Sequence, residues 1–266
     1  MSALELKGTA LITGASTGIG AVYADRLAKR GYNLILVARN EKRLSEIAKR
    51  LEPSGRRIET ITADLSKKDN VKRVAERLRT DPTITALVNN AGLGSARRLL
   101  DENVDDLDSM IYLNVTALTR LALAAMPGFV ARRNGLLINI ASVVALAPDL
   151  LNGTYSGTKA YVVNFTQALK NEVEGKGVTV QAVLPGAIAT PFWDKAGLPV
   201  QHLPNGWVMT SDDLVDASLA GLDQHELITI PSLPDIADWE RFEAARKALG
   251  PNLSREKPAA RYGVEG

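Results

Sequence analysis

The chain has 266 residues, enough for one large domain or two small ones, and 32 Lys and Arg residues against 30 Asp and Glu residues give a net charge of +2. This near balance excludes the one-sided basic surface typical of nucleic-acid binders. Cysteine is absent and histidine occurs twice, which excludes disulfides, thiol nucleophiles and iron–sulfur clusters and disfavours a catalytic metal site. We therefore expect no bound metal and no nucleic-acid partner.

We expect no secretory leader, because Glu5 and Lys7 interrupt the apolar character of the first residues. The most apolar later stretches, such as Leu121–Met126, are too short to span a bilayer. We expect a chain without a membrane span and a cytoplasmic location.

Short apolar runs alternate with longer amphipathic stretches along the whole chain. Several of the runs are nearly continuous in Leu, Ile, Val and Ala, which is typical of parallel strands buried on both faces. The alternation predicts an α/β fold, a single Rossmann-type doubly wound domain at residues 1–250, followed by a polar tail at 251–266. The expected parallel strands are Thr9–Thr13, Asn33–Ala38, Ile58–Ala63, Thr85–Val88, Leu136–Ala141, Val178–Val183 and Leu227–Ile230.

A glycine-rich turn, TGASTGIG at residues 13–20, follows the first predicted strand and precedes a helical stretch. Gly14 lets the chain turn sharply, Gly18 lets the backbone approach a pyrophosphate, and Gly20 lets the helix pack close to the sheet. The N-terminus of that helix offers free N–H groups and a positive dipole end to the phosphates. Placed between the first strand and helix of a βαβ unit, the turn predicts dinucleotide binding.

The end of the second predicted strand indicates which dinucleotide is bound. A cofactor with a free ribose 2′-OH favours a carboxylate there, whereas this chain has Arg39 followed by Asn40. Arg39 can hold a 2′-phosphate with two parallel hydrogen bonds. Taken alone, Arg39 could equally be a solvated residue at a strand end, but the absence of an acidic residue there favours NADP(H), with NAD(H) as the alternative.

A hydroxyl–amine pair lies at the start of a long helical stretch that ends near Glu174. Tyr155 and Lys159 are four residues apart, so they share one helix face. A nearby ammonium group favours the phenolate and lowers the pKa of a tyrosine, so the pair can exchange a proton with a carbonyl or an alcohol. Ser142 directly follows the fifth strand, at the carboxyl edge of the sheet where open α/β folds bind ligands.

These motifs together resemble the classical short-chain dehydrogenase/reductase family over about residues 7–190. No position that matches a catalytic residue of the family departs from its pattern. The resemblance assigns catalytic roles to Asn114, Ser142, Tyr155 and Lys159. It assigns cofactor binding to Gly14, Ser16, Thr17, Gly18, Ile19, Gly20, Arg39, Asp64, Leu65, Asn90, Ala91, Gly92, Tyr155, Lys159, Pro185, Gly186, Ile188 and Thr190.

The resemblance implies hydride transfer between a nicotinamide cofactor and a carbonyl or secondary alcohol, with Tyr155 as general acid or base. It implies that Lys159 lowers the pKa of Tyr155 and holds the nicotinamide ribose, and that Ser142 orients the substrate oxygen. Asn114 would connect Lys159 to solvent through water.

A substrate lid is expected at residues 187–210, where apolar residues such as Phe192, Trp193 and Trp207 favour a lipophilic small molecule. Packing of these residues against the body of the protein explains them equally well. Two other functions stay open: a non-catalytic NADP-binding redox sensor and a nucleotide-sugar epimerase or dehydratase. The resemblance also implies a homodimer or homotetramer built on the helices at 105–132 and 155–174.

Overall fold

The computed structural model describes residues 7–264, except the side chains of Asp194 and Lys195. The chain divides into a large compact unit that ends at Pro231 and a second unit that begins at Ser232. The expected domain boundary at residue 250 stays a prediction.

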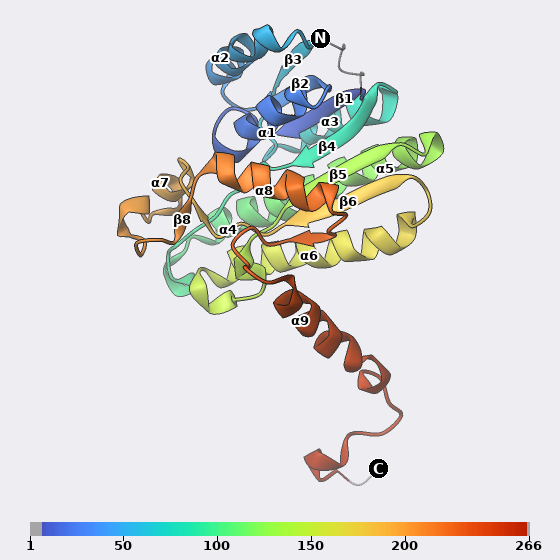
Figure 1. Cartoon of the computed structure of the whole chain (residues 1–266). Coiled ribbons are helices and arrows are strands. Elements are labelled where there is room, and N and C mark those ends of the chain that lie inside the picture. The colour runs from blue at the N-terminus through green and yellow to red at the C-terminus, as the bar shows by residue number, and fades with distance from the viewer. Residues whose placement is uncertain (1–6, 265–266) are drawn as a thin grey trace. The chain divides into compact units, whose positions relative to one another are not determined.

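The large unit is built on a parallel sheet of seven strands in the order β3-β2-β1-β4-β5-β6-β9 (Figure 1). This arrangement confirms the predicted doubly wound, Rossmann-type fold. The last strand is shorter than expected, with two residues in place of four. The strands are β1 (Thr9–Thr13), β2 (Asn33–Ala38), β3 (Ile58–Thr62), β4 (Ile84–Asn89), β5 (Gly135–Ile140), β6 (Val178–Val183) and β9 (Ile228–Thr229).

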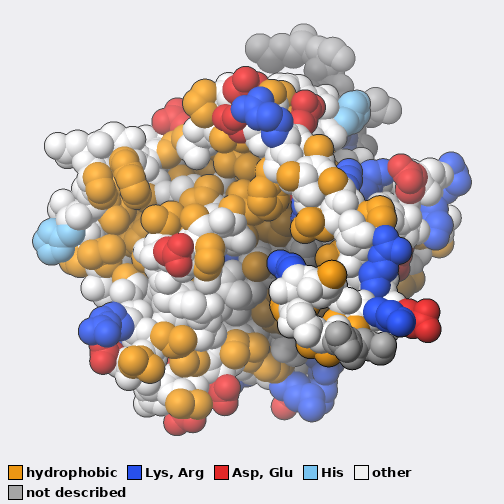
Figure 2. Space-filling view, turned by 90° about the horizontal axis from the view of Figure 1, so that it is seen from below, with side chains coloured by type: hydrophobic (Ala, Val, Ile, Leu, Met, Phe, Trp, Pro, Cys, Tyr) orange, Lys and Arg blue, Asp and Glu red, His pale blue; other side chains and the backbone are white. Residues whose placement is uncertain are grey.

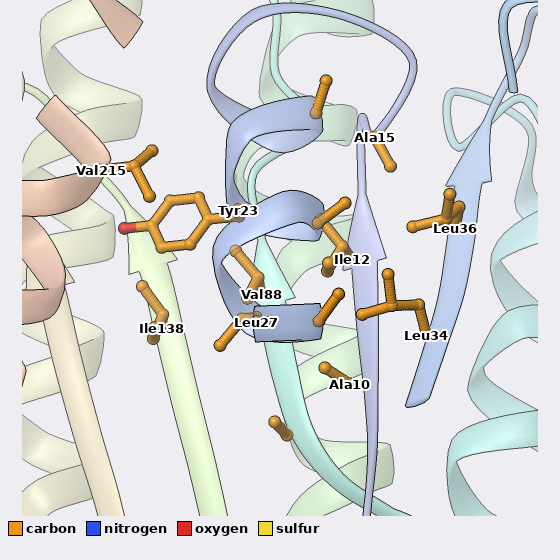
Figure 3. Close-up of a cluster of buried hydrophobic side chains, with 14 of the residues drawn as sticks. Ala10, Ile12, Ala15, Tyr23, Leu27, Leu34, Leu36, Val88, Ile138 and Val215 are labelled. Atoms are coloured by element: carbon orange, nitrogen blue, oxygen red, sulfur yellow. The ribbon is translucent and has the colours of Figure 1, made fainter. Parts of the chain in front are cut away.

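Helices cover both faces of this sheet because its strands bury side chains on both sides. In β1, Ala10 and Ile12 face α1, α2 and α8, whereas Leu11 faces α3, α5 and α6. Figure 3 shows the first of these cores, with Tyr23 and Leu27 of α1 packed over the strands. The helices that form the two layers are α1 (Gly18–Lys29), α2 (Glu41–Leu51), α3 (Lys68–Thr80), α5 (Leu118–Arg132), α6 (Gly153–Val173) and α8 (Ser211–Asp223).

The helix expected at 105–132 begins at Val104 and is not uniform. It consists of α4 (Val104–Ile111), a π-helical turn at Tyr112–Ala117, and α5. Within the described residues, this continuous stretch is the one helix long and apolar enough to cross a membrane by length and composition, and half of its most apolar window is buried. Buried core helices pass the same test, and α5 contributes to the core beneath the sheet.

The expected lid region contains a small feature that the sequence does not predict. Strands β7 (Ala187–Ile188) and β8 (Val208–Met209) pair in parallel, and α7 (Phe192–Ala196) lies between them in the chain. The second unit contains α9 (Ile236–Ala248), which Asp235 caps by accepting a hydrogen bond from the Ala237 N–H at 2.9 Å.

Candidate active site

The glycine-rich turn between β1 and α1 is closely packed. Gly14 and Gly18 have φ values of +67° and +52°, in the left-handed region that favours glycine. At Gly20, a Cβ atom would overlap the carbonyl oxygen of Gly14. The turn therefore needs glycine at these positions, and it leaves the backbone open to a phosphate group.

The N-terminus of α1 is available to an anion. No described side chain caps it, and its first turn holds no acidic residue. The first N–H groups of the helix and the positive end of its dipole therefore suit a pyrophosphate. Ser16, Thr17 and Ile19 lie half-buried along the turn, where sequence reasoning expects cofactor contacts.

The segment after β4 braces this turn. Asn90 donates from its side-chain Nδ2 to the carbonyl oxygen of Thr13 at 2.9 Å. The backbone N–H groups of Asn90 and Ala91 donate to the Thr13 hydroxyl at 2.9 and 3.0 Å. The structure thus brings two of the predicted cofactor-binding segments into contact.

Arg39 and Asp64 lie at the carboxyl ends of the neighbouring strands β2 and β3. The Arg39 side chain is exposed and forms no hydrogen bond or salt bridge with any described residue. Burial raises the pKa of Asp64, but hydrogen bonds from Ser66 and the charges of Arg39 and Lys67 outweigh it, so the net shift is downward. Leu65, which follows Asp64, is buried in the core. This edge of the sheet therefore presents one free guanidinium group beside an ionised carboxylate.

Ser142, Tyr155 and Lys159 come together at the carboxyl edge of β5, each 7% exposed. Asn152 fixes the start of α6 by accepting hydrogen bonds from the N–H groups of Thr154 and Tyr155 at 2.9 and 3.3 Å. The Lys159 Nζ atom donates to a β5 carbonyl oxygen at 2.8 Å and lies 5.7 Å from the centroid of the Tyr155 ring. The Ser142 side chain acts on Tyr155 by lowering the pKa of its hydroxyl. The predicted hydroxyl–amine group is therefore assembled.

Burial dominates the titration of this group. It raises the pKa of Tyr155 to about 12, and the nearby Ser142 side chain offsets this rise only in part. It lowers the pKa of Lys159 to about 8. In this structure the Lys159 ammonium donates to the Ile140 carbonyl oxygen. The expected effect of Lys159 on Tyr155 stays a prediction.

Asn114 lies within the π-helical turn and is 1% exposed. Its Nδ2 donates to the Leu93 carbonyl oxygen at 2.8 Å and to the Thr158 hydroxyl at 3.0 Å, and its Oδ1 accepts from the Leu93 N–H at 2.9 Å. A Cβ atom on Gly92 would lie 3.2 Å from Asn114 Oδ1 and 3.7 Å from Lys159 Nζ. The side chain thus ties the loop after β4 to α6, beside Lys159.

The segment after β6 connects Ser142 to the glycine-rich turn. Pro185 is the residue before Gly186. Its carbonyl oxygen accepts hydrogen bonds from the Ser142 hydroxyl at 3.3 Å and from the Val143 N–H at 2.9 Å. A Cβ atom on Gly18 would lie 2.8 Å from the Thr190 methyl group. The two predicted ends of the site are therefore joined by one segment.

The aromatic residues of the lid do not act as one group. Trp193 is buried and its Nε1 donates to the carbonyl oxygen of Ile188 at 2.9 Å, whereas Trp207 is 59% exposed. The Phe192 ring lies 5.8 Å from the Tyr155 ring. Sequence reasoning missed Gly94, which lies against both of these rings, because a glycine in a loop carries no pattern.

The pKa of Lys159 gives a test that needs no substrate. Burial lowers this pKa from 10.5 to about 8, so above pH 8 the folded chain releases a proton that the unfolded chain keeps. The free energy of unfolding should therefore rise with pH, by about 2 kcal/mol between pH 7.5 and 9.5. Urea unfolding of the wild type and Lys159→Met across this range measures the difference. An equal slope in both proteins would contradict the assignment.

Comparison with known proteins identifies the family. A family model for short chain dehydrogenases matches residues 8–199. The chain belongs to this family. An uncharacterized oxidoreductase of Staphylococcus epidermidis is 34% identical to it over 209 residues, which cover 75% of this chain and 88% of that protein. Human 17-beta-hydroxysteroid dehydrogenase type 3 is 37% identical over 186 residues, covering 68% of this chain and 59% of the human protein.

Two solved dehydrogenases match the structure over nearly its whole length. A short-chain dehydrogenase from Sphingobium yanoikuyae, in complex with NADPH, has a TM-score of 0.92 and 44% sequence identity. The match covers 96% of this chain and 100% of the Sphingobium yanoikuyae chain. The bulky-bulky ketone specific alcohol dehydrogenase from Comamonas testosteroni has a TM-score of 0.88 and 41% sequence identity. The match covers 96% of this chain and 98% of the Comamonas testosteroni chain. This short-chain dehydrogenase is therefore an oxidoreductase by family.

Proposed function

We propose that the protein is an NADP(H)-dependent oxidoreductase that interconverts an apolar ketone and its secondary alcohol. The proposal rests on one observation: Ser142, Tyr155 and Lys159 are buried together. The segment after β6 connects this group to the glycine-rich turn, because it contacts Ser142 at Pro185 and Gly18 at Thr190. A site of this kind places an acid–base group beside a dinucleotide cradle.

The residues of the chain fit a dinucleotide phosphate. The glycine cradle and the free N-terminus of α1 suit the pyrophosphate, and the exposed guanidinium group of Arg39 suits a 2′-phosphate. The NADPH complex of the Sphingobium yanoikuyae enzyme supports this choice. When bound, the cofactor supplies or accepts the hydride.

Tyr155 is the proposed proton donor to the ketone oxygen. Its pKa of about 12 keeps the hydroxyl protonated at neutral pH, so it can donate as the oxygen gains negative charge during reduction. Ser142 would orient the same oxygen through its own hydroxyl, and Lys159 would hold the cofactor. Asn114 keeps the loop after β4 in place beside Lys159.

The substrate is proposed to be a ketone with large apolar groups. Tyr155 forms a buried hydrophobic cluster with Met110 and Val144, and partly buried residues of the loop after β4, α4, the loop before α6 and the lid pack against it. Such surroundings favour apolar substituents over sugars or charged acids. The Comamonas testosteroni enzyme, which is specific for bulky-bulky ketones, supports this substrate class.

A screen of NADPH consumption with aliphatic, aromatic and steroid ketones tests the function. We expect turnover with apolar ketones and slower turnover with NADH. NADPH binding without turnover would favour the redox sensor instead, and turnover of nucleotide sugars would favour the epimerase or dehydratase.

We also propose a cytoplasmic homodimer or homotetramer built on α5 and α6. Leu123 of α5 is 53% exposed and Tyr161 of α6 is 36% exposed, and their helices are joined by a hydrogen bond between Thr119 and Tyr161 hydroxyls at 2.8 Å. Figure 2, seen from below the view of Figure 1, shows that hydrophobic side chains are exposed on this face of the protein. Exposed apolar patches of this kind are typical of interfaces.

A charge at this surface tests the assembly. Leu123→Glu should raise the dissociation constant of the oligomer at least tenfold, because it would bury an unpaired carboxylate. Light scattering coupled to size-exclusion chromatography measures the mass. Ser45→Glu, at an exposed position of α2 over the other face of the sheet, serves as the control. A Leu123→Glu protein that elutes with the wild-type mass would contradict the proposed interface.

A further inference from the structure

Phe192 is a lid residue whose ring lies against Tyr155. It is the first residue of α7, and its ring centroid is 5.8 Å from that of Tyr155, with the two rings tilted by 42°. The Phe192 ring packs against the buried cluster that contains Tyr155. One side of the Tyr155 ring is therefore walled by an aromatic side chain of the lid.

Gly94 provides the space that the Phe192 ring occupies. A Cβ atom at position 94 would overlap Cζ of Phe192, would lie 2.7 Å from Cε2 of the same ring, and would lie 3.2 Å from Cε2 of Tyr155. Gly94 is not among the glycines with positive φ, so an alanine would suit its backbone. The demand for glycine at position 94 therefore comes from the Phe192 ring.

Two contacts hold α7 so that this ring stays in place. Trp193 packs edge-on against Phe192 with ring centroids 5.5 Å apart, and its Nε1 donates to the carbonyl oxygen of Ile188 at 2.9 Å. At the other end of the helix, the Ala96 N–H donates to the Ala196 carbonyl oxygen at 2.9 Å. The second contact joins α7 to the loop that carries Gly94. The Phe192 ring and the space beside Gly94 that it fills are therefore held together by a backbone hydrogen bond.

We propose that Phe192 is a specificity-determining residue that limits the size of the ketone substituent on the α7 side of Tyr155. This role rests on the proposed function of the site. The carbonyl carbon must lie beside the Tyr155 hydroxyl, so a substituent directed toward α7 meets the Phe192 ring. Because interiors are closely packed, removing a ring there makes room for several more carbon atoms.

The first test compares aryl ketones whose second substituent grows from methyl to ethyl, propyl and phenyl. For Phe192→Ala, we expect the ratio of kcat/KM for the phenyl ketone to that for the methyl ketone to rise at least tenfold over the wild type. Phe192→Leu should give an intermediate ratio. The NADPH dissociation constant should stay within about twofold, because Phe192 faces Tyr155. Trp207→Ala, at the exposed aromatic position of the same lid, should leave the ratio unchanged.

A double-mutant cycle tests the pairing of Phe192 with Gly94 without relying on turnover. Gly94→Ala should lower the Tm of the wild type, because its methyl group displaces the Phe192 ring. In the Phe192→Ala background, the same substitution should leave the Tm nearly unchanged. If Gly94→Ala lowers the Tm equally in the wild type and in Phe192→Ala, the proposed contact between Gly94 and the Phe192 ring is wrong.

The outcomes separate this role from the proposed function. A wild type that reduces the ketones, together with an unchanged size ratio in Phe192→Ala, rejects the role of Phe192 and leaves the function standing. A wild type that reduces none of the ketones rejects the proposed function and this role with it.

Discussion

Tyr155→Phe is expected to lower kcat by about 10³-fold while the NADPH dissociation constant changes by less than about threefold. The substitution removes one oxygen atom and with it the proton that the ketone oxygen would receive. The phenyl ring can keep the contacts with Phe192 and with the buried cluster. Steady-state kinetics and fluorescence titration of NADPH measure the two quantities.

Tyr161→Phe is the matched control for this experiment. Tyr161 lies on the same helix, is partly exposed, and stacks on Phe165 with ring centroids 5.9 Å apart. Its loss of a hydroxyl should leave kcat nearly unchanged. A Tyr155→Phe enzyme that keeps a tenth or more of the wild-type kcat would show that another group donates the proton.

Arg39→Asp is expected to reverse the cofactor preference. The substitution replaces a free guanidinium group by a carboxylate, which repels a 2′-phosphate and can accept a hydrogen bond from a ribose 2′-OH. The ratio of kcat/KM with NADPH to that with NADH should fall by about 10²-fold or more, because charge-assisted paired hydrogen bonds are strong. Initial rates with both cofactors and one ketone give this ratio.

Arg50→Asp makes the same charge change at the other end of α2, where Arg50 is exposed. It should alter the ratio by less than about threefold, because a distant surface charge is screened by salt. Equal effects of the two substitutions would mean that net charge, and not a contact of Arg39, sets the preference.

The fold could be predicted from the sequence because its strands carry a local signal. The run at Asn33–Ala38 is apolar after its first residue, and the run at Val178–Val183 is apolar except for Thr179 and Gln181; the structure forms strands at both. The pairing of β7 with β8 could not be predicted, because two-residue strands carry no periodicity. The π-helical turn at Tyr112–Ala117 was missed for a similar reason, since its residues fit an ordinary helix.

Some features of the site could likewise be predicted from the sequence, and others could not. The glycine-rich turn and the four-residue spacing of Tyr155 and Lys159 are local patterns, so they are visible in the sequence. The contact of Gly94 with Phe192 joins segments far apart in the chain and depends on how the lid packs. The raised pKa of Tyr155 likewise follows from burial, which a motif does not reveal.

Transfer of an isotopic label tests the central claim most directly. The enzyme is incubated with an aryl ketone and NADPH that carries deuterium at C4 of the nicotinamide, in separate samples for each face of the ring. We predict that one of the two samples yields an alcohol with one deuterium on the carbinol carbon, and that Tyr155→Phe yields almost none. NADPH that binds but gives no deuterated alcohol with any apolar ketone would contradict it.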